Sequence, residues 1–355
     1  MASIDRTAYP RFKRVVSARE LAESFTPAAG EVEWAQGKTT SGEHFLALVV
    51  RLKCYQRLGY FPKLNEVPGV VVAHVRGSLG LPEGTAAEVG AVRTAKRHRQ
   101  FVRERLGVVY EPARVRRVAK GAVRSAAQTK DNPADLINVA LEELVRQSCE
   151  LPGYTTLDAM VATVRAEVSA GFFTASAGRM SPAERARLER MLLVDPSTRR
   201  SELDWLKDPA KAATLGKFKR RLEHLADLDA IRPTERWLEG VPPGKVGHFA
   251  GEARVTDAAD FRKVLNTEKR LTLLASLVHT LRVSSRDEVT TMFCKRVAVI
   301  HKKGKDRLEE LREEPPGGVR ATAGGVRRRA GRRPRGDRPH GPGARGAGSR
   351  GYRGR

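Results

Sequence analysis

Apolar residues recur at helical spacing along most of the chain. Between Ser41 and Gly59 the large apolar side chains follow intervals of three and four: Phe45, Leu48, Val49, Leu52 and Tyr55. That spacing places them on one face of an α-helix. Serine before such a stretch and glycine after it are typical of an N-cap and of a left-handed C-terminal residue. The pattern predicts an amphipathic helix over residues 42–58.

The same reasoning predicts helices through the remainder of the chain and no series of alternating strand-like segments. We expect them near 68–79, 94–107, 112–127, 132–150, 154–173, 182–193, 210–230, 256–284 and 285–313, with a possible break within 256–284. The stretch 232–249, "RPTERWLEGVPPGKVGHF", is rich in Pro and Gly and predicts a linking loop. The expected fold class is all-α: tandem helical bundles of helix-turn-helix type, followed by a longer helical region.

A capped helix start at Ser181, with Pro182 and Glu184 after it, indicates a boundary just after Gly178. The expected domains are a first helical DNA-binding domain, a second one, a third helical domain that begins a dimerisation region, and a basic tail. Their ranges are 1–90, 91–178, 179–314 and 315–355.

Charge points to a polyanionic partner. The net charge is +25, and the tail from Pro315 onward holds twelve Arg, one Asp and no Lys. Residues 1–314 therefore carry about +14 without the tail. A chain this basic attracts nucleic acid first of all.

The most informative charges lie between residues 93 and 106. Arg93, Lys96, Arg99 and Arg103 are spaced three, three and four, so they share one face of a helix. The apolar members of the stretch and His98 fall on the opposite face: His98, Phe101, Val102 and Leu106. A helix that packs on one side and presents a row of cations on the other suits a DNA groove or its phosphates. The alternative is a solvated helix face.

Two further helices repeat this arrangement. The first carries its cations at the same spacing: Arg114, Arg117, Lys120 and Arg124, opposite Val115, Val118, Ala119 and Ala122. The second flanks an expected apolar face with a cluster of cations: Lys217, Lys219, Arg220 and Arg221, around Leu215, Phe218, Leu222 and Leu225. Glu223 and Asp227 dilute this last patch, so contact with DNA and simple solvation are equally good interpretations of it.

Catalytic and metal signatures are missing from the sequence. The three cysteines are far apart and form no C-x-x-C pair, and no H-E-x-x-H or G-x-S-x-G stretch occurs. "GKTT" at Gly37 has Val32 where a P-loop needs glycine. We expect no cofactor and no metal site in this chain. Without an apolar leader or membrane-length run, we expect a soluble, cytoplasmic, nucleoid-associated protein.

Four fragments in order resemble a known family. They are "FLALVVRLKCYQRLGYFP", "VPGVVVAHV", "TAKRHRQFVRERLG" and "ELPGYTTLDAM". These fragments, in this order, are similar to the N-terminal region of the large replicative transposases of the Tn-three (class II) family, and the likeness covers about residues 1–314. The resemblance implies tandem helical domains that bind the terminal inverted repeats of a transposon as double-stranded DNA. It implies that Arg93, Lys96, Arg97, Arg99 and Arg103 belong to a DNA-reading helix.

The resemblance also implies a C-terminal RNase H-like domain with three acidic, magnesium-binding residues, to which no residue here can be assigned. After Glu314 the composition switches to Arg, Gly, Pro and Ala, whose codons are rich in G and C. We expect residues 315–355 to be a disordered frameshift product rather than a selected tail. The expected function is then binding of transposon ends without cleavage.

Three alternatives stay open from the sequence. One is a general DNA-binding protein, and another is a complete transposase or nuclease. The third is a helical assembly protein whose basic faces are merely solvated. It is suggested by heptad-like spacing in 285–313, at Val289, Met292 or Phe293, Val297, Ile300, Leu308 and Leu311. That spacing allows self-association or pairing with a full-length transposase.

Overall fold

The computed structural model describes residues 4–108, 110–208, 214–263 and 266–313. Within these ranges the regular structure is helical, with an isolated β-bridge between Val194 and Ser201. The all-α prediction is confirmed. None of the described helices combines the length and apolarity that crossing a bilayer requires. The expected tail, residues 315–355, lies outside the described residues.

The chain divides into two compact units, residues 1–297 and 298–355. Three hydrophobic cores form within the first unit. In the second unit the described residues, 298–313, are helical and exposed.

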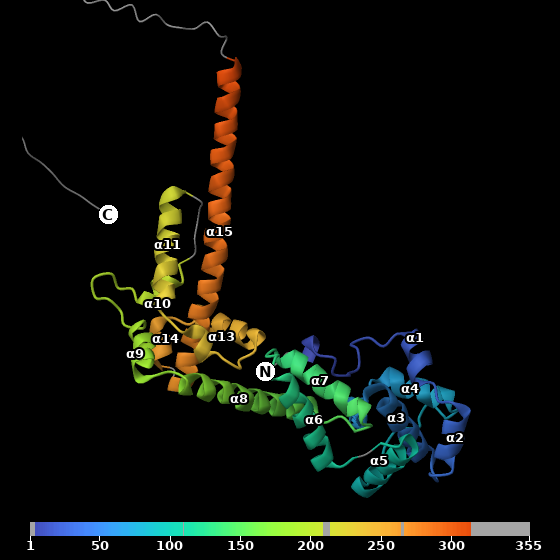
Figure 1. The fold of residues 1–355 in the computed structure, drawn as a ribbon. Coiled ribbons are helices and arrows are strands. Elements are labelled where there is room, and N and C mark those ends of the chain that lie inside the picture. Colours follow the sequence, from blue (N-terminus) through green and yellow to red (C-terminus); the bar gives the residue numbers. More distant parts are fainter. Residues whose placement is uncertain (1–3, 109, 209–213, 264–265, 314–355) are drawn as a thin grey trace, which may run out of the picture. The chain divides into compact units, whose positions relative to one another are not determined.

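The first core surrounds α3 (Gly42–Leu58), which packs against its neighbours α2, α4 and α5 (Figure 1). The helices of this region are α1 (Ala18–Glu20), α2 (Ala29–Gln36), α3, α4 (Gly69–Ser78) and α5 (Val92–Leu106), with a π-helical turn at Leu21–Phe25. Twelve of the 17 residues of α3 are buried, which explains its Leu- and Val-rich sequence. The Ser41 side chain accepts a hydrogen bond from the His44 amide, 3.3 Å away, as the cap prediction required.

The second core joins α6 (Pro112–Ala126), α7 (Pro133–Arg146) and the first half of α8 (Tyr154–Gly178). Tyr9, from the N-terminal segment, is buried in it, and its hydroxyl donates to the Pro152 carbonyl at 2.9 Å. Leu157, Val161 and Val164 of α8 belong to this core.

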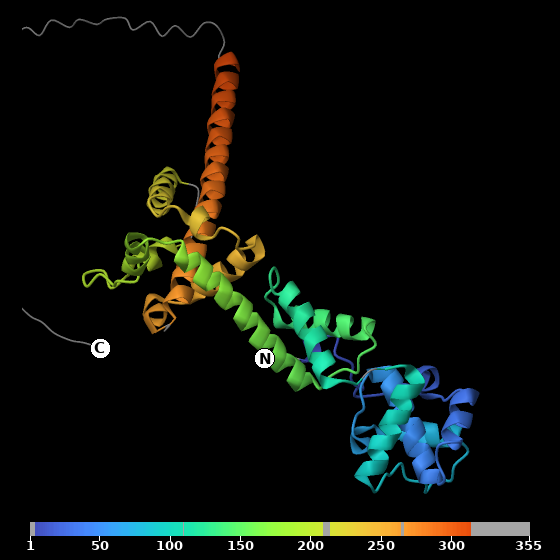
Figure 2. The same cartoon turned by 60° about the horizontal axis from the view of Figure 1, so that its bottom comes forward.

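The third core begins on the second half of the same helix, α8, with Phe173 and Ala177. Each helix that follows contributes buried residues to this core: α9 (Pro182–Arg190), α10 (Glu202–Leu206), α11 (Leu215–Asp229), α12 (Thr234–Trp237), α13 (Pro243–Val255), α14 (Ala258–Lys263) and α15 (Thr267–Glu313). The expected domain ranges stay a prediction. The unbroken helix α8 supplies residues to both the second and the third core (Figure 2).

Two predictions about the third region were wrong. The expected loop at 232–249 contains α12 and the start of α13, because Pro242 and Pro243 occupy the N-cap and first turn of α13, where proline is tolerated. Its Trp237 is fully buried. The expected stretch 256–284, with its possible break, is divided into the short α14 and the start of α15, but the expected separation at residue 284 is wrong, because α15 continues as a single 47-residue helix.

The end of α3 supplies a first testable prediction. Gly59 has φ +75°, and a Cβ there would lie 3.0 Å from Leu151 Cδ1. Gly59→Ala combines left-handed strain with this collision, so we expect a loss of about 2–3 kcal/mol in the free energy of unfolding, measured in urea. Gly80→Ala is the control, since Gly80 has φ +66° and open space. It should lose only about 1 kcal/mol, and equal losses would contradict the Leu151 contact.

Candidate nucleic-acid interface

Helix α5 buries one face and exposes cations on the other. Val102 is fully buried in the first core, and His98 keeps 2% of its surface exposed. Arg93, Lys96 and Arg97 are exposed. Gly107 ends the helix in the left-handed conformation, as its sequence position predicted. The amphipathic arrangement expected for 93–106 is therefore present at the N-terminal half of the helix.

Arg103 departs from the expected cationic row. Its Nε donates to Glu150 Oε2 at 2.7 Å, and its guanidinium lies 4.0 Å from the ring centroid of Tyr110. Both the Arg103 and Glu150 side chains are mostly buried. Arg103 thus joins α5 to the segment before α8 with its charge already neutralised, while Arg99 is half-buried.

Helix α6 carries the second basic face. Val115, Ala119 and Val123 are buried, and Arg117 and Lys120 are exposed. Arg114 is half-buried. Arg124 bonds to Glu167 of α8 at 2.7 Å, although more than half of its side chain stays exposed. α5 contributes to the first core and α6 to the second, so the two basic faces belong to different cores.

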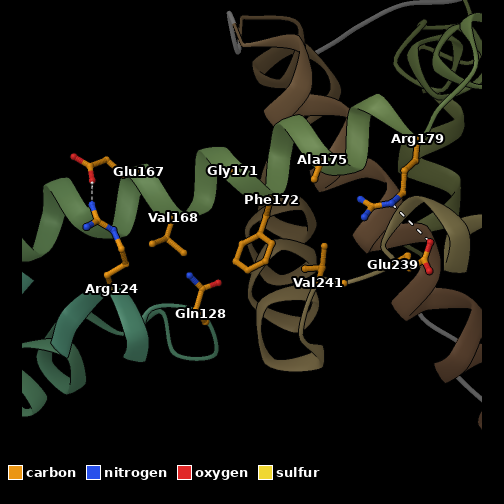
Figure 3. Close-up of a pocket in the computed structure, with 11 residues that line it drawn as sticks. Arg124, Gln128, Glu167, Val168, Gly171, Phe172, Ala175, Arg179, Glu239 and Val241 are labelled. Carbon is orange, nitrogen blue, oxygen red and sulfur yellow. Dashed lines mark hydrogen bonds and ion pairs between the residues drawn. The ribbon is translucent and has the colours of Figure 1, made fainter. Parts of the chain in front are cut away.

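Arg124 also lines a cavity of about 400 Å³ against α8 (Figure 3). Phe172, Val168 and Val241 give it apolar walls. The Arg124–Glu167 pair marks one side of it, and Arg179 with Glu239, 3.9 Å apart, marks another. Each cation that borders the cavity has a carboxylate partner.

The third basic cluster, on α11, is arranged differently from the prediction. Lys217, Lys219 and Arg220 are exposed, but Arg221 keeps 7% of its surface and pairs with Glu288 of α15. Leu215 and Leu222, expected on the apolar face, are exposed. The buried residues of α11 are Arg221 and Leu228. The ion pair with α15 allows Arg221 to be buried, although hydropathy alone predicts that an arginine side chain is exposed.

On α3, several polar side chains are held by carboxylates within the first core. Lys53 is buried 3.3 Å from Glu31, and Gln56 donates to the same carboxylate at 2.6 Å. Arg57 bonds to Glu20 at 3.1 Å. Burial acts to raise the pKa of Glu31, but hydrogen bonds from Gln56 and the Ala28 amide, with the Lys53 charge, lower it overall.

One basic residue of this region was missed by sequence reasoning. Arg51 lies on α3 with 8% of its surface exposed, and its Nε is buried without a hydrogen-bond partner. The sequence offered one signal for it. Arg51 follows His44 by seven residues, so the two residues lie on the same face of the helix. Hydrophobic neighbours on both sides concealed it. Among the described residues no three His, Cys, Asp or Glu side chains gather as a metal site.

Residues 1–164 match a protein-family model described as a domain of unknown function (DUF4158). The match covers the first core, α6, α7 and the first part of α8, and so includes both basic faces on α5 and α6. It covers less than half of the 355 residues. The description states no activity.

Proposed function

We propose that this chain binds double-stranded DNA at the terminal inverted repeats of a transposon, as the N-terminal part of a replicative transposase. The observation that carries the proposal is the pair of consecutive helices, α5 and α6, that each bury an apolar face and expose cations. Lys96 and Arg97 on α5, with Arg117 and Lys120 on α6, are exposed in this way. The proposal assigns binding to this chain, not strand cleavage.

The charge distribution supports a nucleic acid rather than an acidic protein as the partner. Many cations of the first unit have carboxylate partners inside the fold, as Arg103, Arg124 and Arg221 do. The exposed cations of α5 and α6 add to a net charge of about +14 over residues 1–314. Phosphates of a duplex supply the regularly spaced negative charge that such helices fit.

Loss of two exposed cations on α6 tests the proposal. We expect Arg117→Ala with Lys120→Ala to weaken binding of an inverted-repeat duplex by about tenfold or more and to reduce the slope of log K against log salt by about 2. Fluorescence anisotropy over a salt series measures both quantities. A shuffled duplex of equal length separates sequence recognition from general DNA binding.

The control is a double variant with the same change in charge elsewhere, Arg19→Ala with Arg146→Ala. Both of its arginines are exposed and pair with carboxylates of their own helical neighbourhood, Glu23 and Glu143. Its affinity and salt slope should stay close to the wild-type values. Equal effects from the two double variants would show that α6 is not a DNA-binding helix.

A second candidate function, helix-mediated assembly, has its own observation. Seven large apolar side chains of α15 are exposed: Val283, Phe293, Val297, Val299, Ile300, Leu308 and Leu311. Exposed apolar side chains at near-heptad spacing are typical of helices that pair with another helix. Size-exclusion chromatography with light scattering, with and without duplex, distinguishes the two functions, since assembly alone gives oligomers that DNA does not change.

A further inference from the structure

Helix α2 and the turn that follows it lie against the basic helix α5. Arg105 of α5 donates from Nη2 to the Gly30 carbonyl at 3.1 Å, and its guanidinium carbon lies 4.8 Å from the ring centroid of Trp34. In the turn after α2, Nζ of Lys38 lies 5.3 Å from the ring centroid of Phe101, which is also on α5. Two contacts between a cation and an aromatic ring therefore hold α2 and its turn beside α5.

Phe101 brings a second cation to the same place. The guanidinium carbon of Arg97, one turn earlier on α5, lies 5.1 Å from the centroid of the same ring. Lys38 and Arg97 are both exposed, and neither forms an ion pair with a carboxylate of the described residues. Arg103, further along the same helix, differs from them because Glu150 neutralises it. Two exposed cations from different elements thus share one aromatic ring at the surface.

The backbone of the turn gives Lys38 a defined position. The Lys38 amide donates to the Ala35 carbonyl at 3.1 Å, and the Thr39 hydroxyl donates to the same carbonyl at 2.9 Å. Lys38 is the lysine of the "GKTT" stretch, in which Val32 replaces the glycine that a P-loop needs. The stretch is therefore no nucleotide site, but it orders the backbone from which an unpaired lysine extends beside α5.

We propose that Lys38 joins Arg97 in holding the phosphate backbone of one strand of the bound duplex, so that the turn between α2 and α3 is part of the DNA interface. The inference rests on the proposed function and adds to it a contact outside α5 and α6. Two like charges beside one ring repel each other, and an anion between them removes that repulsion. The phosphates of a duplex accept charge-assisted hydrogen bonds from both ammonium and guanidinium groups.

Loss of the Lys38 charge gives the first readout. Lys38→Gln should weaken binding about tenfold and reduce the slope of log K against log salt by about 1. The loss should be equal for an inverted-repeat duplex and a shuffled one, because a phosphate contact carries no sequence information. Lys63→Gln is the matched control, since Lys63 is exposed and pairs with Glu66 at 3.3 Å. Its affinity should stay within about twofold of wild type.

Neutral linkages locate the contact on the duplex. A methylphosphonate carries no charge, so one such linkage at the contacted position should weaken wild-type binding about tenfold. Lys38→Gln should lose little more at that linkage, because its contact is already missing. Arg97→Gln should show the same coupling at that linkage or an adjacent one of the same strand. Couplings on different strands, or none for Lys38, would overturn the shared contact.

The wild type separates the two proposals. If it binds the inverted repeat specifically and Lys38→Gln matches it in affinity and salt slope, the Lys38 contact is refuted and the proposed function stands. If it binds the shuffled duplex equally well and Lys38→Gln weakens both, recognition of transposon ends fails and the contact stands. If the wild type binds neither duplex, both proposals are refuted.

Discussion

Asp131→Asn should lower the free energy of unfolding by about 3–5 kcal/mol, because it leaves a fully buried lysine without a counter-ion. The Lys245 side chain of α13 has no exposed surface and pairs with Asp131, which precedes α7. His248 Nε2 lies 2.7 Å from the same carboxylate, and Arg165 Nη1 of α8 lies 3.8 Å from it. Asp131 therefore holds cations from two helices at a single carboxylate that is almost fully buried. Urea unfolding followed by circular dichroism measures the loss.

A second substitution checks that the cause is the unpaired charge. Lys245→Met in the Asp131→Asn background should recover most of the lost stability, since it removes the buried cation and keeps its volume. Asp260→Asn is the control, because Asp260 pairs with Lys263 at the surface and should change stability by no more than about 0.5 kcal/mol. An Asp131→Asn loss as small as that of Asp260→Asn, or no recovery in the double variant, would contradict the role assigned to Asp131.

Local signals predicted most of the helices correctly. Ser41 and Gly59 bound α3, and Gly107 ends α5, because caps act on backbone groups within a few residues. The same signals failed where tertiary packing decides. Pro242 and Pro243 were interpreted as loop residues, although α13 begins there and is buried through Val246 and Phe249. The junction near residue 284 was expected to break a helix that in fact continues.

The candidate site shows the same limit more sharply. Sequence spacing placed Arg93, Lys96 and Arg117 on helix faces that the structure exposes. Spacing carries no information on long-range partners, so it treated Arg103 and Arg221 as equivalent to them, although Glu150 and Glu288 neutralise these two. It also passed over Arg51, whose distinction is the lack of such a partner among the described residues. Tertiary ion pairing therefore decides which of these cations remain without a carboxylate partner.

His98 gives the last prediction, a pH dependence of stability. Burial first, and then the charges of Arg51, His44 and Arg97, lower the pKa of His98 to about 4 from 6.5. The unfolded chain therefore binds a proton near pH 6.5 that the folded protein binds only near pH 4. This contribution to stability is complete above pH 6.5 and is lost as the pH falls towards 4, with a slope of at most about 1.4 kcal/mol per pH unit. We expect roughly 2–3 kcal/mol to be lost over this window.

Urea unfolding at intervals from pH 7 to pH 5 measures the slope above the range in which carboxylates such as Glu31 titrate. His98→Gln should reduce it, because glutamine takes up no proton. Burial also lowers the pKa of His224, which contributes with the same sign, so part of the slope remains until His224→Gln is added. His301→Gln, at an exposed position on α15, should leave the slope unchanged. An unaltered slope in His98→Gln would mean that folding does not change the pKa of His98, and would contradict the effect assigned to its burial.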